Sequence, residues 1–173
     1  VAYKAMTVNT SPTVSGGTSV CVGATVPLSG SPSGGTWSSS NILIATVGST
    51  GIVTGVGGGL VTISYTRGGC SALYTVSVNL IPVITGPGSL CMGMAMTLGV
   101  TPAGGSWTSG SPSLAIVGST GSVTAVTSGI VNIYYTASGC YSFRAVTVSA
   151  SPAPITGATT IAAGSTTTLS DLT

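Results

Sequence analysis

The chain repeats its own pattern at an interval of 70 residues. Residues 116–126, IVGSTGSVTAV, closely restate residues 46–56, TVGSTGIVTGV. The same spacing separates Cys21 from Cys91, Trp37 from Trp107, Cys70 from Cys140, and Pro82 from Pro152. A fixed period of this length is typical of a tandem array in which each repeat is one structural unit. We therefore expect two complete domains, at residues 14–83 (the first repeat) and 84–153 (the second repeat).

Both flanking segments also follow the repeat pattern. Residues 3–12 align with the stretches that end at Pro82 and Pro152, so residues 1–13 are predicted to hold the last strand of a preceding repeat, Ala2 to Val8, and a linker. Residues 155–170 resemble residues 84–99, so residues 154–173 are predicted to hold the opening strands of a following repeat. Such strands expose unpaired backbone.

Two partners for these unpaired strands follow from the pattern. If the chain is a window of a longer polypeptide, they pair with the rest of the neighbouring repeats. If the 173 residues are the whole subunit, they pair with another copy by strand addition. The first alternative is favoured, because the two fragments together lack the strands needed to rebuild a domain.

Apolar and polar residues alternate along several short segments, which is the pattern of half-buried strands. The residues expected to face inward are Val61, Ile63 and Tyr65, then Tyr74, Val76 and Val78, and in the second repeat Val131, Ile133 and Tyr135. Stretches rich in Gly, Ser and Pro separate these runs and predict turns. Six or seven short strands per repeat, with no helix, predict an all-β fold built as an antiparallel sandwich or barrel.

Residues 34–66 carry five landmarks in order: a Trp in a W-S-S strand, A-T-V, G-x-V-T-G-V, a Gly-rich turn and T-I-S-Y. This stretch resembles the group-2 bacterial immunoglobulin-like repeat, in the Cys-containing variety of bacterial surface proteins. The resemblance implies tandem immunoglobulin-like β-sandwich domains, with Trp37 and Trp107 in the core on the third strand. Pro112 replaces Ile42 in the second repeat, so the strand that starts there should be short or at an edge.

Charged residues are almost absent, and this excludes most catalytic chemistry. The chain has no His and no Glu, and its charged side chains are Lys4, Arg67, Arg144 and Asp171. General acid–base catalysis needs a titratable group near neutral pH, so we expect neither an enzyme nor a cofactor site. The stretch GVGGGL, residues 55–60, resembles a phosphate-binding loop, but no helix follows it and a turn is expected. A net charge of +2 does not indicate nucleic-acid binding.

The four cysteines predict disulfides and therefore an oxidising, extracellular location. Three pairings are possible. The repeat favours Cys21 with Cys70 and Cys91 with Cys140, because each domain then closes on itself. Zinc binding is not predicted, since neither a C-x-x-C motif nor a His is present. Residues 155–170 have Ala162 at the expected cysteine position, so the following repeat should lack this bridge.

A membrane-spanning helix is not expected either. No charged residue occurs from Gly68 to Ser142, but Pro and Gly interrupt this stretch and its apolar residues alternate.

Three functions fit these features. The favoured one is a structural subunit of an extracellular bacterial filament or surface stalk, built from end-to-end domains that associate with one another or with neighbouring repeats. The alternatives are an adhesin module that binds carbohydrate or a host protein, and a spacer in a secreted enzyme. Successive repeats are nearly identical, whereas a recognition site would be expected in the loops of one of them. Pro82 in the linker from Asn79 to Gly86 is expected to hold neighbouring domains in a fixed order.

Modification by sugars is a further expectation. Outward Ser and Thr residues are abundant and could carry O-linked glycans, which would solubilise an uncharged fibre. Asn9 lies in the only N-linked acceptor motif, Asn9-Thr10-Ser11. The alternative is an unmodified chain, because outward Thr is ordinary in strands.

Overall fold

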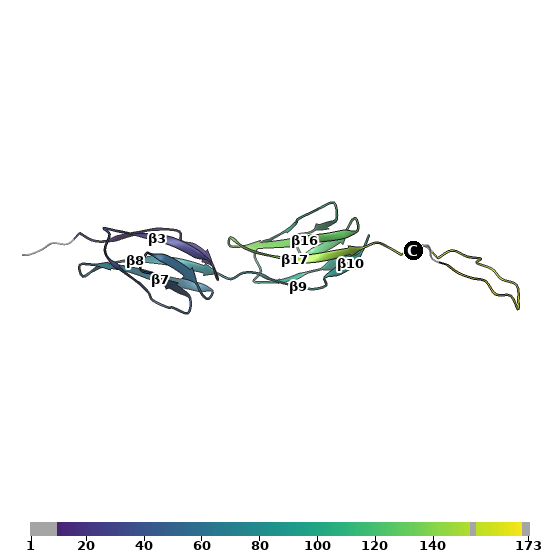
Figure 1. Cartoon of the computed structure of the whole chain (residues 1–173), viewed down its shortest axis with the longest axis horizontal. Coiled ribbons are helices and arrows are strands. Elements are labelled where there is room, and N and C mark those ends of the chain that lie inside the picture. Colours follow the sequence, from purple (N-terminus) through teal and green to yellow (C-terminus); the bar gives the residue numbers. More distant parts are fainter. Residues whose placement is uncertain (1–9, 153–154, 171–173) are drawn as a thin grey trace, which may run out of the picture. The chain divides into compact units, whose positions relative to one another are not determined.

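The computed structural model describes residues 10–152 and 155–170 (Figure 1). All regular structure in these residues is β-strand, which confirms the all-β expectation. The first repeat holds β1 (Thr13–Gly16), β2 (Ser19–Cys21), β3 (Thr25–Ser31), β4 (Thr36–Ser39), β5 (Ala45–Val47), β6 (Ile52–Gly55), β7 (Gly59–Arg67) and β8 (Cys70–Asn79). The strand predicted at Ala2 to Val8 lies outside the described residues.

The second repeat follows the same order with one more strand. It holds β9 (Val83–Thr85), β10 (Ser89–Cys91), β11 (Ala95–Thr97), β12 (Gly99–Thr101), β13 (Ser106–Ser109), β14 (Ala115–Val117), β15 (Ser122–Ala125), β16 (Gly129–Ala137) and β17 (Cys140–Ser149). Both repeats exceed the six or seven strands expected. The second repeat has one strand more than the first because Leu98 separates β11 from β12, where the first repeat has the single strand β3.

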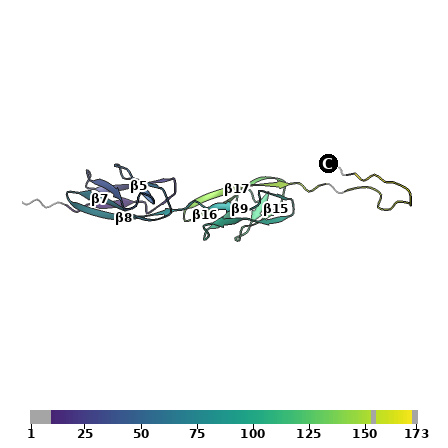
Figure 2. The ribbon, with the colours of Figure 1, turned by 90° about the horizontal axis from the view of Figure 1, so that it is seen from below.

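The strands of the first repeat form two four-stranded sheets, in the orders β1-β3-β6-β5 and β2-β8-β7-β4. Figure 2 shows β5 on one face of this sandwich and β7 and β8 on the other. In the second repeat β10-β17-β16-β13 form one sheet, and the strands opposite are divided between β11-β15-β14 and β12-β9.

The opening segment of each repeat contributes one strand to each of the two faces of the sandwich. β1 pairs antiparallel with β3, from Thr13 opposite Ser31 to Gly16 opposite Leu28. β2 then pairs parallel with β8, and β10 pairs parallel with β17 in the second repeat. The expected antiparallel sandwich is therefore a mixed one. An opening segment divided in this way covers an edge of each sheet, which protects backbone groups that would otherwise be unpaired.

The inward residues of the long strands build the cores. Val61, Ile63, Val76 and Val78 are buried with Val20, Leu28, Ala45 and Val53. The second core contains Leu98, Ala115, Val123, Ala125, Val131, Ile133, Val146 and Val148. The alternation in the sequence is thus confirmed as a strand pattern, with Val61, Ile63 and Tyr65 of β7 and Val131, Ile133 and Tyr135 of β16 buried.

The two tryptophans pack beside these cores and are partly buried. Trp37 lies on β4, the fourth strand of its repeat rather than the third, because the opening segment supplies two strands. Its ring centroid lies 4.6 Å from that of Tyr65, and the equivalent distance from Trp107 to Tyr135 is 4.8 Å. Both pairs therefore close one side of a core with two aromatic rings.

The chain divides into two compact units that do not coincide with the repeats. The first comprises the residues up to Val83 together with Thr101–Gly105 and Thr136–Ser142. The second comprises Ile84–Val100, Ser106–Tyr135 and the residues from Phe143 onward. Two short segments of the second repeat thus belong to the first unit. The domain limits at residues 14–83 and 84–153 stay a prediction.

Residues 155–170 begin the repeat pattern again. Thr156 and Ser170 form an antiparallel bridge through hydrogen bonds of 2.8 and 3.0 Å. In the second repeat the equivalent strands, β9 and β12, pair with each other. The two segments differ in burial, since Leu169 is 60% exposed whereas Leu98 at the equivalent position is 2% exposed.

The strand after Pro112 is short and at an edge, as expected. β14 has three residues and is the last strand of the sheet β11-β15-β14. Pro112 is not the reason, however, because β5 in the first repeat has the same length and the same edge position with Ile42 in its place. Among the described residues, no helix is long and apolar enough to cross a membrane.

Candidate functional site

A disulfide joins Cys21 to Cys140, with the two Cα atoms 5.8 Å apart at a sequence separation of 119. Cys21 is the last residue of β2, and Cys140 is the first residue of β17, directly after a turn. The bond therefore links the first repeat to the second. Both cysteines lie in the first compact unit, since the segment Thr136–Ser142 belongs to it.

The predicted pairing of Cys21 with Cys70 is wrong, and the strand register explains why. In the parallel pair of β2 and β8, Cys21 lies opposite Asn79. Cys70 and Asn79 are the first and last of the ten residues of β8, which places them about 30 Å apart at about 3.3 Å per residue. A disulfide needs Cα atoms within about 7 Å.

The same geometry excludes the predicted pairing of Cys91 with Cys140. Cys91 lies opposite Ser149, the last residue of β17, whereas Cys140 is the first of its ten residues. Cys70 is half-buried and Cys91 is exposed, and both are free thiols in this structure. A repeat of this fold cannot close on itself through these cysteines, because the two positions lie at opposite ends of one strand.

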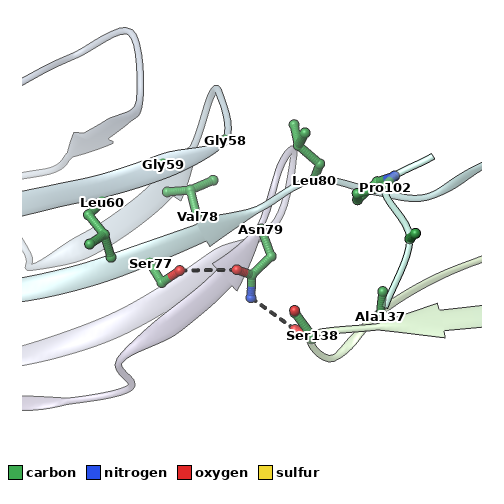
Figure 3. A pocket seen from close by; sticks show the side chains of 11 residues that line it. Gly58, Gly59, Leu60, Ser77, Val78, Asn79, Leu80, Pro102, Ala137 and Ser138 are labelled. Carbon is green, nitrogen blue, oxygen red and sulfur yellow. Dashed lines mark hydrogen bonds between the residues drawn. The ribbon is translucent and has the colours of Figure 1, made fainter. Parts of the chain in front are cut away.

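Polar contacts hold the turn before Cys140 in place. The side-chain amide of Asn79 donates a hydrogen bond of 2.9 Å to the carbonyl oxygen of Ser138 (Figure 3). The hydroxyl of Ser77 donates a hydrogen bond of 3.0 Å to Oδ1 of Asn79 and so orients that amide. The Sγ atom of Cys140 lies 3.8 Å from the carbonyl oxygen of Asn79. Asn79 therefore contacts both the turn and the disulfide.

Two hollows flank these contacts. One has a volume of about 350 Å³ and is lined by Gly58, Gly59, Leu60, Ser77, Val78, Asn79, Leu80, Pro102, Ala103, Ala137 and Ser138 (Figure 3). The other, of about 510 Å³, is lined by Cys21, Val22, Gly23, Ala24, Ile81, Gly139, Cys140 and Tyr141. No carboxylate, imidazole or ammonium group is among these lining residues. Both hollows suit apolar packing rather than proton transfer.

The charged side chains do not gather at this site. Arg144 binds backbone carbonyl oxygens, with Nη2 2.5 Å from Gly86 and Nε 3.2 Å from Pro87. Arg67 ends β7 and is exposed. Lys4, Asp171 and the sequon residue Asn9 lie outside the described residues. Within residues 10–152 and 155–170, no group of three or more metal-ligating side chains lies together.

The Gly-rich stretch at residues 55–60 is a turn, as predicted. β6 ends at Gly55 and β7 begins at Gly59, so the stretch connects two strands. Sequence reasoning missed the role of Asn79 and Ser138. Neither residue stands out in the sequence, and their contact depends on a packing arrangement that strand patterns do not encode.

Comparison with known families identifies the fold of the first repeat. The model of the bacterial Ig-like domain (group 2) matches residues 3–76. This part of the chain is similar to that family. The match spans the landmarks from which the Ig-like repeat was expected, including Trp37 and the stretch at residues 46–56. A comparison with curated protein sequences finds no match.

The solved structure of invasin shows the same fold. The crystal structure of invasin, a bacterial integrin-binding protein, is similar with a TM-score of 0.56 and 14% identity, over 79% of this chain and 38% of the invasin chain. Domains 1–6 of the surface layer protein SbsC match with a TM-score of 0.33 and 18% identity, over 79% of this chain and 25% of that chain. The chain thus spans well under half of either protein.

The cellular location of the chain is inferred from the Cys21–Cys140 disulfide and from the similarity of residues 3–76 to the bacterial Ig-like domain. Disulfides persist in oxidising environments and are rare where cellular thiols keep cysteines reduced. The Cys21–Cys140 disulfide and the similarity of residues 3–76 to the bacterial Ig-like domain indicate a location at the cell surface or outside the cell.

Proposed function

We propose that the chain is a structural part of an extracellular bacterial filament or surface stalk, with no catalytic role of its own. The observation that carries this proposal is the Cys21–Cys140 disulfide, which ties two successive repeats together covalently. In a protein that has to hold successive repeats in a fixed order, such a bond strengthens the connection between them.

The linker between the repeats supports the same function. Pro82 is fully buried, and its ring restricts the backbone at this point. Such a linker favours one arrangement of successive domains over many. Images of single molecules should therefore show one tilt and twist between neighbouring domains in all copies, and widely scattered angles would count against the proposal.

The surface chemistry also suits association. Large apolar side chains are exposed on the long strands, among them Leu60, Leu73 and Ile130. Two Arg residues are the charged groups of the described part of the chain. Because charged surfaces keep proteins apart in solution, such a surface favours contact with neighbours. Further repeats or further copies are the partners that we propose.

Electron microscopy of the source cells tests this function directly. Gold-labelled antibodies raised against the chain should decorate fibres or stalks that project from the surface. The matched control is the same preparation treated with antibodies blocked by purified chain. Gold confined to the cell body, with no projecting structure, would contradict the proposal.

Adhesion is a second candidate, supported by one specific difference between the repeats. The rings of Tyr134 and Phe143 pack with centroids 5.6 Å apart, and Phe143 and Tyr141 are exposed. The first repeat has Ser64, Leu73 and Ser71 at these positions. Exposed aromatic residues are enriched at binding sites.

The first repeat supplies the control for adhesion. A variant with Tyr134→Ser, Phe143→Leu and Tyr141→Ser gives the second repeat the side chains of the first. If this face binds a glycan or a host protein, the natural chain should bind to a glycan array or to host cells and this variant should not. Equal binding by both would remove the candidate.

Glycosylation belongs to the same proposal. Hydroxyl side chains in residues 155–170 are exposed throughout, so enzymes could reach them. We propose O-linked sugars there and an N-linked sugar at Asn9. Peptides that contain Asn9 or hydroxyl residues of 155–170, taken from the protein isolated from its source, should exceed the mass of the bare polypeptide. A mass equal to that of the bare polypeptide would contradict this.

A further inference from the structure

We propose that the first repeat binds an uncharged saccharide in a polar pocket between the loop that connects β3 to β4 and the turn that connects β5 to β6. The pocket has a volume of about 370 Å³. Small-molecule sites have volumes of about 300–1,000 Å³. This inference goes beyond the structural function and does not depend on it. It also concerns a different repeat from the exposed aromatic face around Tyr134 that supports adhesion.

Hydrogen bonds within the protein hold both walls of the pocket in position. The hydroxyl of Tyr65 accepts a hydrogen bond from the backbone N–H of Gly35 and donates one to the carbonyl oxygen of Pro32, both of 2.8 Å. The backbone N–H of Leu28 donates a hydrogen bond of 2.9 Å to the carbonyl oxygen of Gly51 in the turn. The walls are therefore fixed before a ligand arrives, so binding does not have to order them.

Two aromatic rings belong to the lining of the pocket. The indole of Trp37 is half-buried and the ring of Tyr65 is buried, and their centroids lie 4.6 Å apart. A sugar ring has an apolar face of C–H groups, and a partly exposed aromatic ring offers a matching surface. In the described part of the chain, the indole N–H of Trp37 has no hydrogen-bond partner. It is therefore a donor available to a sugar hydroxyl.

Four hydroxyl groups also line the pocket. They belong to Ser29 in β3, Ser33 in the loop, and Ser49 and Thr50 in the turn, and all four residues are exposed. Among the described residues, none of these side chains forms a hydrogen bond with the protein. A hydroxyl group both donates and accepts hydrogen bonds, as the hydroxyls of a saccharide do, so the two sets of groups can pair.

The absence of charge in the lining narrows the class of ligand. No charged side chain is among the residues that line the pocket. A phosphate, a carboxylate or an acidic sugar would bring a charge that finds no partner there, which is unfavourable. An apolar ligand would bury the four hydroxyls without replacing their hydrogen bonds to water. An uncharged ligand with many hydroxyls and apolar ring faces fits best, and that is a neutral saccharide.

The second repeat lacks part of this lining. Gly99 and Ala103 stand at the positions of Ser29 and Ser33, so two of the hydroxyls are missing. The aromatic pair is kept, since Trp107 packs against a tyrosine in the same way. We therefore expect the saccharide in the first repeat only, and Trp107 is a control within the same molecule.

The test follows the indole N–H signals of both tryptophans by nuclear magnetic resonance in the full chain. A Trp107→Phe variant assigns the two signals. The probes are glucose, galactose, mannose, N-acetylglucosamine, lactose and maltose, each added up to about 10 mM, which is tenfold above a Kd of about 1 mM. At least one probe should shift the signal of Trp37 and leave that of Trp107 unchanged.

Paired variants show whether the pocket causes the shift. Ser29→Gly with Ser33→Ala gives the pocket the residues of the second repeat. Binding should become about tenfold weaker, because hydrogen bonds to two hydroxyls are lost. Ser19→Gly with Ser38→Ala makes the same changes at exposed positions outside the pocket and should leave the Kd unchanged. Retained dispersion of the remaining signals shows that both variants fold.

Several results would overturn the inference. They are the absence of a shift with every probe, equal shifts of both tryptophans, and equal Kd values for the two double variants. Loss of binding in the variant with Tyr134→Ser, Phe143→Leu and Tyr141→Ser would overturn it as well, because the sugar would then lie on the second repeat. None of these results bears on the structural function, which the search for fibres on cells tests separately.

Discussion

The hydroxyl group of Tyr74 donates a hydrogen bond of 2.7 Å to the carbonyl oxygen of Gly16. At the equivalent positions of the second repeat, Arg144 donates to the carbonyl oxygen of Gly86. Two unlike side chains therefore make the same connection, between the last long strand and the opening segment of the repeat. What is kept in both repeats is the hydrogen bond and not the residue.

Replacing Arg144 tests this equivalence. Arg144→Ala removes the hydrogen bonds to Gly86 and Pro87 and should lower the free energy of unfolding by about 1 kcal/mol. Arg144→Tyr should recover most of the loss, since Tyr74 makes the same bond. Chemical unfolding followed by Trp fluorescence measures both. Arg67→Ala, which removes an equal charge from an exposed position, should change stability by less than about 0.5 kcal/mol.

The hydroxyl of Tyr65 connects two parts of one loop. It accepts a hydrogen bond of 2.8 Å from the backbone N–H of Gly35 and donates one of 2.8 Å to the carbonyl oxygen of Pro32. Tyr65→Phe keeps the ring packing against Trp37 and leaves both backbone groups without their partner. We expect a loss of about 1–3 kcal/mol. Tyr74→Phe, which removes one exposed hydrogen bond, should cost less in the same unfolding experiment.

The repeated GSTG stretch is explained by its last glycine. Gly51 has φ of +83°, and a Cβ atom there would collide with the carbonyl oxygen of Leu28 and lie 3.0 Å from the ring of Trp37. Gly34 has φ of +86° with open space around it. Gly34→Ala should therefore cost about 1 kcal/mol from backbone strain alone. Gly51→Ala should cost about 3 kcal/mol, because overpacking adds to that strain.

Trp fluorescence can report the unfolding of the first repeat alone. In a Trp107→Phe background the remaining signal comes from Trp37, which lies beside the altered glycine. Equal losses for the two alanine variants would show that the turn tolerates a side chain and that Trp37 does not depend on it.

The disulfide connectivity is checked by peptide mapping of the unreduced chain. We expect one peptide pair that joins Cys21 to Cys140, and none that joins Cys21 to Cys70. Closing a loop of 119 residues stabilises a folded chain by at most about 5 kcal/mol in the chain-entropy model. Reduction should lower the thermal midpoint accordingly, with Cys70→Ser as the control that leaves this bond intact. A Cys21–Cys70 peptide would contradict the structure.

The fold class could be read from the sequence because strand alternation and turn chemistry are local. Val61, Ile63 and Tyr65 alternate with polar residues, and the structure buries all three. The number of strands was harder to predict. Whether the opening segment forms one strand or two depends on its crossing between sheets, which is not a local property. The next strand is continuous as β3 but divided at Leu98 into β11 and β12, although Leu28 and Leu98 are both buried.

The cysteine pairing could not be read from the sequence for a different reason. Spacing shows that each repeat contains two cysteines, and closing each repeat on itself is the simplest interpretation. The register of β2 against β8 decides otherwise, because it places Cys21 beside Asn79 at the far end of the strand that Cys70 begins. Parallel pairing of a three-residue strand leaves no signature in the sequence.

The Cys21–Cys140 bond also determines how far the chain can lengthen under tension. Tension applied on either side of the bonded cysteines passes through the sulfur–sulfur link and bypasses the chain between them, which spans a sequence separation of 119. Fully extended, that length of chain would reach about 400 Å. While the bond is intact, this segment carries no tension, so a load along the chain cannot unfold β7 or β16. A reducing environment would break the bond, and the same load could then lengthen the chain through this segment as well.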